Sequence, residues 1–460
     1  MSENFRLEHD SVGELQVPAD AYYGVQSLRG ARNFQITGKM LHPNFIRNMA
    51  KIKKACAIVN GNIGAFDMKI ADAISKACDE IIAGALEDSF ICDVIQGGAG
   101  TSANMNANEV IANRAIEILG GVKGDYSICH PNDHVNCAQS TNDVIPTAGK
   151  MTVIDLIKPL IDNLIVLVDA FEAKAKEFDG IIKMGRTQLQ DAVPIRLGQE
   201  FHAYASVIKR DVKRIALAEE AMHSMNMGGS AIGTCINVEP EYLEQIAPVL
   251  SDVAGYELTL ADDLIDATHN LDGFVFVSSA LKTCAINLSK IANDLRLMSS
   301  GPRTGIGEIN LPPKQNGSSI MPGKINPVIP EAMNQIAFNI MGNDTTVTLA
   351  AEAGQLELNA FEPIIFRCIF ESLDTLRNGV KMFTEECIEP LTVNKTACKR
   401  HIDHSIGIVT ALCPILGYKK SAELAKKALR EDKDIRDVVR DETDIPHSTL
   451  EEILNPKNMI

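Results

Sequence analysis

Five long stretches of helical periodicity constrain the fold of this 460-residue chain more than any other feature. In each stretch, apolar residues recur at the three- and four-residue spacing of a helix that buries one face. The stretches cover residues 151–178, 197–225 and 271–300, and two more begin near Pro330 and Glu362. Few strand patterns lie between them. The pattern predicts an all-α fold built on a long central helical bundle.

The rest of the chain differs in character on either side of this bundle. Residues 1–139 have shorter helical patterns and more loops, and predict a mostly helical N-terminal domain. Residues 140–390 form the predicted central bundle domain, and the more charged residues 391–460 predict a small helical C-terminal domain. A chain of this length accommodates two or three domains.

Composition excludes several classes of function. A net charge of −16 disfavours binding to nucleic-acid phosphates, and an aromatic content of 5 % without Trp disfavours base stacking. Lys158, Pro159 and Asp162 interrupt the apolar residues 154–170, so no membrane span is expected there. Eleven cysteines without a CxxC pair, and an N-terminus without a secretory pattern, predict a cytoplasmic protein with reduced thiols.

Three polar stretches interrupt the helical pattern, and each has a plain structural interpretation. In "QGGAGTSANMNANE" (residues 96–109), the glycines resemble a dinucleotide fingerprint, but no strand precedes them, and Thr101 or Ser102 capping a helix explains them as well. In "HPNDHVNCAQSTNDVIPT" (residues 130–147), His130, Asp133 and His134 are either metal ligands or parts of a capping turn. The stretch "KMGRTQLQDAVP" (residues 183–194) has the position of a connecting loop at a helix end.

A fourth stretch, "GSSIMPGKINPVIPE" (residues 317–331), is called the signature loop below. It combines two serines, a lysine and an asparagine with several glycines and prolines. Together, the four stretches supply hydroxyls, amides and one or two cations, but no cofactor motif. Such groups suit a small carboxylate anion, and a reaction in which negative charge develops on a carboxylate. No cofactor and no metal site are therefore predicted.

The signature loop resembles that of the aspartase/fumarase superfamily. "GGAGTSANMNANE" and "GRTQLQDAVP" are similar to two other blocks of the superfamily, and the resemblance extends over essentially the whole chain in order. "QSTND", "EINLP", "NPVIPE" and "AEAGQLELN" make it closest to the aspartase branch. The resemblance implies a homotetramer with one long helical bundle, in which each active site draws residues from three subunits.

The resemblance also implies roles for individual residues. Ser318 matches the general base that removes a C3 proton from L-aspartate, leaving an aci-carboxylate. The remaining matches all bind substrate: the β-carboxylate by Thr101, Ser140, Thr141 and Ser319, the α-carboxylate by Thr187, Lys324 and Asn326, and the amino group by Asn142 with Thr101.

Gln188 occupies a position where fumarases, and some aspartases, have histidine. Glutamine exchanges no proton near neutral pH, which favours loss of ammonia, already protonated as ammonium, over loss of hydroxide. Gln188 also weakens any proton relay from Glu331, which we expect to be a structural carboxylate paired with a polar neighbour. Two alternatives remain: a class II fumarate hydratase acting on L-malate, and a non-catalytic helical tetramer.

Overall fold

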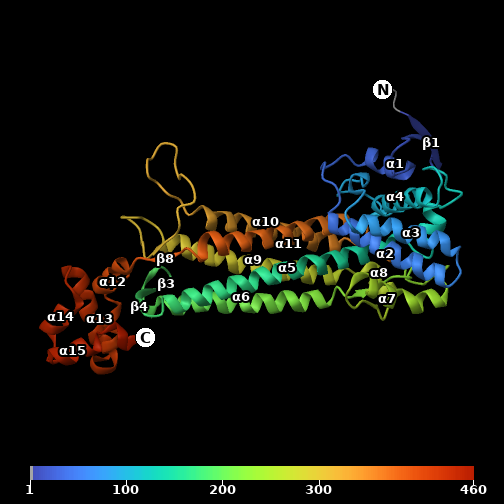
Figure 1. The fold of residues 1–460 in the computed structure, drawn as a ribbon. Coiled ribbons are helices and arrows are strands. Elements are labelled where there is room, and N and C mark those ends of the chain that lie inside the picture. The colour runs from blue at the N-terminus through green and yellow to red at the C-terminus, as the bar shows by residue number, and fades with distance from the viewer. Residues whose placement is uncertain (1–3) are drawn as a thin grey trace. The chain divides into compact units, whose positions relative to one another are not determined.

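The computed structural model describes residues 4–460, which are mostly helical (Figure 1). Spatial contacts divide the chain into two units. Unit 1 comprises Met1–Ile161, Arg214–Thr283 and Asn339–Thr375, and unit 2 comprises Asp162–Lys213, Cys284–Phe338 and Leu376–Ile460. This division groups residues by contact and does not test the three consecutive domains expected from the sequence, which stay a prediction.

All five predicted long helices are present. They are α5 (Thr141–Glu177), α6 (Leu197–Glu220), α9 (Asp272–Met298), α10 (Val328–Glu352) and α11 (Glu362–Phe383). Shorter helices surround them: α1 (Val25–Asn33), α2 (Pro43–Asn62), α3 (Met68–Ile82), α4 (Thr101–Ile118), α7 (Pro240–Ala254) and α8 (Leu264–His269), then α12 (Lys395–His404), α13 (Cys413–Glu431), α14 (Ile435–Glu442) and α15 (His447–Ile453).

Two helix boundaries differ from the sequence prediction. Helix α5 begins at Thr141 rather than at residue 151, although Pro146 lies within it. Proline cannot donate to the carbonyl four residues earlier, so the oxygen of Asn142 needs another donor. Asn226 Nδ2 donates to that oxygen at 2.9 Å. Helix α6 ends at Glu220, before residue 225, because the chain there enters a short strand.

Within residues 4–460, the strands form four two-stranded sheets. They are β1 (Phe5–Asp10) with β2 (Gly13–Pro18), β3 (Ile182–Thr187) with β4 (Gln190–Arg196), β5 (Ser224–Met225) with β6 (Thr259–Leu260), and β7 (Ile309–Asn310) with β8 (Thr392–Val393). Residues 183–194 are therefore a hairpin, not the simple connecting loop that the sequence suggested. Its two-residue turn consists of Gln188 and Leu189, with φ of 54° and 61°. A type I′ turn needs these positive angles. The pair in this turn is Gln-Leu and not the Asn-Gly or Asp-Gly pair from which such a turn is usually predicted.

Unit 1 has an aromatic core centred on α11. Phe366 stacks on Phe370 with ring centroids 5.8 Å apart, and Phe274 and Phe45 contact Phe366 at 5.1 and 5.7 Å. Helix α5 passes so close to this cluster that a Cβ on Gly149 would lie 2.5 Å from the Phe366 ring. Glycine at that position permits the close helix approach.

Unit 2 has two apolar clusters. Phe171, Phe178, Phe201 and Tyr204 pack together between α5 and α6. The C-terminal helices enclose a second cluster that includes Leu412, Val439 and Leu450, and Met184 of β3 inserts into it. The β3–β4 hairpin is thereby fixed to the C-terminal helices, beside which it lies in Figure 1.

Helix α9 is the one helix within residues 4–460 whose length and composition would suffice to cross a membrane. Of its most apolar window, 56 % is buried inside the protein. Core helices of soluble proteins have the same combination of length, hydropathy and burial.

Candidate active site

The predicted substrate-binding residues of unit 1 lie where two helices begin. Thr101 is the first residue of α4 and Thr141 is the first residue of α5. The two helix starts adjoin, because Asn104 Nδ2 donates to Thr141 Oγ1 at 3.2 Å. A Cβ on Gly100 would also lie 2.9 Å from the side chain of Ile145. Two helix N-termini side by side present partial positive charge and unpaired N–H groups to an anion.

The hydroxyl groups at these helix starts differ in what they offer a carboxylate. Ser140 Oγ accepts from the backbone N–H of Asn142 at 3.1 Å, and Thr141 Oγ1 accepts from Asn104, so both keep a hydroxyl hydrogen to donate. Thr101 Oγ1 donates to the carbonyl of Gly98 at 2.6 Å. It has to rotate away from that carbonyl before it can donate to a substrate.

Asn142 is oriented by the loop between β5 and α7. Its Nδ2 donates to the carbonyl of Ala231 at 2.7 Å. That bond directs the amide nitrogen toward the protein and leaves Oδ1 as an acceptor. An acceptor is what contact with a substrate ammonium requires.

Asp143 is a buried residue that holds the backbone around this site in place, and the sequence did not single it out. Its buried carboxylate accepts from the backbone N–H groups of Ser140, Gly228 and Ser230 at 2.9, 3.2 and 3.3 Å. It therefore ties the Ser140 turn to the loop that holds Asn142. Burial raises the pKa of Asp143 to about 7, against the lowering effect of these hydrogen bonds. Its place directly after "QSTN" was the available sequence signal.

In unit 2, Thr187 and Gln188 lie at the exposed tip of the β3–β4 hairpin. Thr187 pairs with Gln190 across the turn, and Gln188 is in the left-handed region. A non-glycine residue there stores backbone strain, which often accompanies a functional position.

A buried charge cluster lies at the base of this hairpin, and the sequence analysis also missed it. Glu308 is fully buried and is contacted by Arg186 at 2.8 Å, His401 at 2.9 Å and Lys183 at 3.2 Å. Lys183 also reaches Glu200 at 3.1 Å. Burial alone would raise the pKa of Glu308, but Lys183, His401 and Arg186 together lower it, so the carboxylate is ionised.

The signature loop turns back on itself. The N–H of Gly317 donates to the carbonyl of Lys324 at 2.9 Å, and Asn326 Nδ2 donates to the carbonyl of Gly317 at 2.7 Å. Within this turn, the backbone N–H groups of Ile320 and Met321 donate to Ser318 Oγ at 3.2 and 3.0 Å. Two donors directed at one hydroxyl oxygen stabilise its negatively charged form.

In Figure 1, this loop is drawn in gold and leads into α10. Its exposed part extends away from the helices of its unit. Ser319 and Lys324 are exposed there, as is Ile320 with 84 % of its surface accessible. An apolar side chain left so accessible in one chain is available for contact with another.

The predicted site residues thus fall into two sets. Thr101, Ser140, Thr141 and Asn142 belong to unit 1, and the other six belong to unit 2: Thr187, Gln188, Ser318, Ser319, Lys324 and Asn326. The unit 1 residues gather at adjoining helix starts. The convergence of the two sets in one site stays a prediction.

Two other expectations concern charged residues. Glu331 lies in the first turn of α10, and within residues 4–460 of a single chain its carboxylate has no hydrogen-bond or ion-pair partner, so its pairing in the assembled protein stays a prediction. His130 accepts from the backbone N–H groups of Asn132 and Asp133 at 3.2 Å, as a helix cap. In the described part of the chain, no group of three His, Cys, Asp or Glu side chains is placed to hold a metal.

Comparison with known proteins identifies the family. A family model described as "Lyase" matches residues 13–342, and one described as "Fumarase C C-terminus" matches residues 408–460. A curated relative from Bacillus sp., named aspartate ammonia-lyase, is 50 % identical over 459 residues, covering 100 % of this chain and 98 % of the relative. The chain belongs to the aspartase/fumarase superfamily of lyases.

Solved structures of this superfamily share the fold. The fumarate lyase:delta crystallin from Brucella melitensis bound to cobalt has a TM-score of 0.96 at 47 % identity, covering 99 % of both chains. The class II fumarase from Schistosoma mansoni has a TM-score of 0.97 at 32 % identity, again covering 99 % of both chains. The all-α superfamily fold predicted from the sequence is confirmed.

Proposed function

We propose that this protein is an aspartate ammonia-lyase, a carbon–nitrogen lyase that reversibly converts L-aspartate to fumarate and ammonia. One observation carries the proposal: 50 % identity over the full chain to a relative with that name. The identity to the class II fumarase is lower, at 32 %.

Ser318 is the general base in this proposal. Its hydroxyl removes the C3 proton of L-aspartate, and it has to act as an alkoxide because a serine hydroxyl is a very poor base. The N–H groups of Ile320 and Met321, which donate to its oxygen, support this role by stabilising the anion.

The electrons released from the C3–H bond pass onto the neighbouring β-carboxylate, which becomes a doubly charged aci-carboxylate. Thr101, Ser140, Thr141 and Ser319 are proposed to bind it. The hydrogen bonds from these neutral donors strengthen when the second negative charge develops on the carboxylate. The donors therefore stabilise the transition state more than they stabilise the bound substrate. The adjoining starts of α4 and α5 support this assignment for the unit 1 residues.

The other end of the substrate is held by a separate set of groups. Lys324 binds the α-carboxylate through its positive charge, and Thr187 and Asn326 fix the orientation of that carboxylate. Asn142 accepts from the substrate ammonium through Oδ1. Collapse of the aci-carboxylate then forms the double bond and expels ammonia from C2, anti to the abstracted proton.

Fumarate hydratase is the second candidate, because it uses nearly all the same groups. Gln188 favours the ammonia-lyase. Expulsion of hydroxide from L-malate calls for an acid, whereas ammonia leaves without one, and glutamine cannot supply a proton near neutral pH.

The active enzyme in this proposal is a cytoplasmic homotetramer without a cofactor, acting on a small dicarboxylate and binding neither nucleic acid nor membrane. Each active site draws residues from three subunits. The extended signature loop (Figure 1) supports this arrangement, because Lys324 is exposed and Ser318 is half-buried on a loop that extends away from the helices of its unit.

Fumarate absorbance tests the proposal. Purified protein is assayed with L-aspartate and, separately, with L-malate. We expect fumarate from L-aspartate and little from L-malate. The opposite preference would establish the hydratase, and absence of both activities in an assembled protein would favour the non-catalytic alternative.

A further inference from the structure

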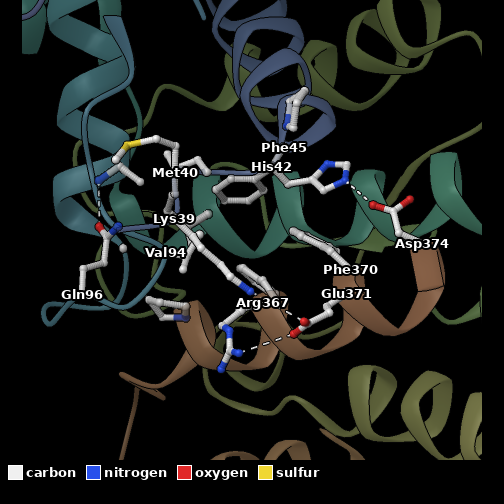
Figure 2. A pocket seen from close by; sticks show the side chains of 17 residues that line it. Lys39, Met40, His42, Phe45, Val94, Gln96, Arg367, Phe370, Glu371 and Asp374 are labelled. Atoms are coloured by element: carbon white, nitrogen blue, oxygen red, sulfur yellow. Dashed lines mark hydrogen bonds and ion pairs between the residues drawn. The ribbon is translucent and has the colours of Figure 1, made fainter. Parts of the chain in front are cut away.

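A cavity in unit 1 lies next to the start of α4 (Figure 2). Its volume is about 270 Å³, close to the lower end of the range typical of small-ligand pockets. Phe45, Phe366 and Phe370 form an aromatic wall, and Met40 and Val94 add aliphatic surface. None of these residues takes part in the proposed reaction.

The rim of this cavity carries two cations that share one carboxylate. Lys39 Nζ is 3.7 Å from one oxygen of Glu371, and an Arg367 Nη is 3.5 Å from the other. Both distances are long for charge-assisted contacts, which are usually below about 3 Å. Within residues 4–460, the buried Arg367 Nε has no hydrogen-bond partner. The neighbouring carboxylate of Asp374 is held separately by His42 at 2.9 Å, as Figure 2 shows.

The position of Lys39 is fixed by a carboxylate behind it. Asp93 accepts from the backbone N–H groups of Thr37 and Gly38 at 2.7 and 2.9 Å, and the N–H of Val94 donates to the carbonyl of Lys39 at 3.0 Å. Burial would raise the pKa of Asp93, but hydrogen bonds from Ile95, Thr37 and Gly38 lower it to about 2. The segment that carries Lys39 to the rim is therefore anchored at all physiological pH values.

The opposite wall of the cavity adjoins the proposed substrate site. Gln96 Oε1 accepts from the backbone N–H of Ala103 in the first turn of α4 at 2.9 Å. Gly100, Ala103 and Ile145 line the cavity, while Thr101 lies between the first two in the sequence. A molecule in the cavity thus touches the backbone turn that positions Thr101.

We propose that this cavity is a regulatory site for an apolar monocarboxylate, whose aromatic or branched aliphatic body packs against Phe45, Phe366 and Phe370 and whose carboxylate binds Arg367 and Lys39. The ligand carboxylate gives Arg367 and Lys39 a close anionic partner, in addition to the long contacts that each makes with Glu371. The regulatory role rests on the proposed function, whereas the binding site does not depend on it.

The binding test uses the assembled full-length protein and 3-phenylpropionate as the probe. The chain contains no Trp, so Met40→Trp at the rim, where Met40 is 53 % exposed, introduces a single fluorescent reporter. We expect a saturable change in its emission with 3-phenylpropionate, and calorimetry of the wild-type protein should give the same affinity. The neutral 3-phenylpropanamide should bind about tenfold more weakly, because it lacks the charge that Arg367 and Lys39 recognise.

Variants separate this cavity from the catalytic site. Arg367→Gln should weaken binding about tenfold, whereas Lys381→Gln, which removes an exposed cation from the same helix, should not. Val94→Phe should fill the cavity and abolish binding; circular dichroism checks that each variant is folded. Absence of binding to wild-type protein, equal binding of the amide, or loss of binding on Lys324→Met with retention on Arg367→Gln would each overturn the proposal.

The regulatory role has its own measurement. Saturating 3-phenylpropionate should change the KM for L-aspartate in wild-type protein and leave it unchanged in Val94→Phe. By reciprocity, fumarate should shift the affinity for 3-phenylpropionate by the same factor without displacing it. Binding with an unchanged KM would overturn the coupling to Thr101. Failure of the proposed lyase activity would be distinguishable, because the fluorescence titration does not require turnover.

Discussion

The carboxylate of Glu308 accepts a hydrogen bond from Arg186 at 2.8 Å and so links the residue before β7 to β3. Arg186 directly precedes Thr187, and β7 leads into the signature loop. One buried carboxylate thus anchors the two segments of unit 2 to which we assign substrate chemistry. His401 joins the same carboxylate and connects it to α12.

We expect Glu308→Gln to destabilise the protein strongly. The variant keeps the size of the side chain but removes the carboxylate that Arg186 contacts, and it leaves Lys183 with Glu200 as its remaining counter-charge. Breaking a buried ion pair in this way typically lowers the free energy of unfolding by about 3–5 kcal/mol. Urea unfolding measures the loss. Glu172→Gln, which removes a half-buried carboxylate paired with Lys209 and His202, is the control and should cost below about 1 kcal/mol.

The same variant should lower kcat more than it raises KM, because it displaces the hairpin and loop relative to bound substrate. Glu308→Asp, which retains the charge, should recover part of kcat. Wild-type kcat in a folded Glu308→Gln protein would show that the cluster does not position catalytic groups.

The sequence predicted the long helices well because burial of one face imposes a period that local residues reveal. The predictions that failed depend instead on contacts that local residues do not reveal. The start of α5 depends on Asn226, distant in sequence, which satisfies the carbonyl that Pro146 leaves free. The hairpin at Gln188 and Leu189 depends on positive φ angles that neither residue favours, so tertiary contacts must impose them.

In the candidate site, too, some residues could be named from the sequence and others could be recognised only in the structure. The hydroxyls and amides of the candidate site are assigned through their resemblance to family motifs, and their common role stays a prediction. Asp143 and Glu308 could not be assigned in this way, because their importance comes from burial and from partners distant in sequence. Both lie within motifs that the sequence offered, "QSTND" and "EINLP", but neither motif shows that the carboxylate is buried.

Ser318→Ala should lower kcat by several orders of magnitude while substrate binding and assembly survive. The alanine removes the proposed base but leaves the loop turn, which is closed by Gly317 and Asn326. Initial rates of fumarate formation measure the effect, and Ser279→Ala on the surface of α9 serves as the control. A kcat near that of wild type would exclude Ser318 as the base.

Mixed tetramers test whether subunits share active sites. We take Ser318→Ala and Thr187→Ala, each inactive or nearly so, and expect partial activity after subunit exchange. If the two residues serve one site from different chains, some sites in a mixed tetramer carry neither substitution. Differently tagged subunits verify the exchange, and verified mixing without any recovery would contradict sharing between these two positions.

Asp143 should make stability depend on pH in a defined window. Its pKa is raised from the ordinary 3.8 to about 7 in the folded chain. Below pH 3.8 the carboxyl is protonated whether the chain is folded or not. Between the two values, the folded chain keeps a proton that the unfolded chain has lost, so the free energy of unfolding falls as pH rises.

We expect Asp143 to contribute a fall of about 3 kcal/mol between pH 4 and 7, because the slope of about 1.4 kcal/mol per pH unit flattens near both pKa values. Urea unfolding of wild type and Asp143→Asn across this range isolates it, because the asparagine does not titrate. The wild type should lose stability relative to the variant as pH rises. Parallel curves would mean that the hydrogen bonds from Ser140, Gly228 and Ser230 keep Asp143 ionised throughout.

Lys324→Met should chiefly weaken substrate binding. The methionine keeps an apolar side chain and deletes the only charge that we assign to the α-carboxylate. The protein carries a net charge of −16, so long-range attraction of a dicarboxylate is not expected to help, and capture has to be local. Loss of a charge-assisted contact in a closed site should raise KM for L-aspartate by the equivalent of about 2–4 kcal/mol.

Lys314→Met is the matched control, because Lys314 lies shortly before the same loop and is paired with Glu386 rather than assigned to substrate. A fall in kcat of Lys324→Met as well would fit a second role, in which the ammonium favours the ionised form of Ser318. In the single chain Lys324 is exposed, so its role requires that assembly or loop closure bring it to the substrate. If Lys324→Met and Lys314→Met both retain wild-type rates at limiting and saturating L-aspartate, Lys324 is a solvated surface residue and the α-carboxylate is bound without it.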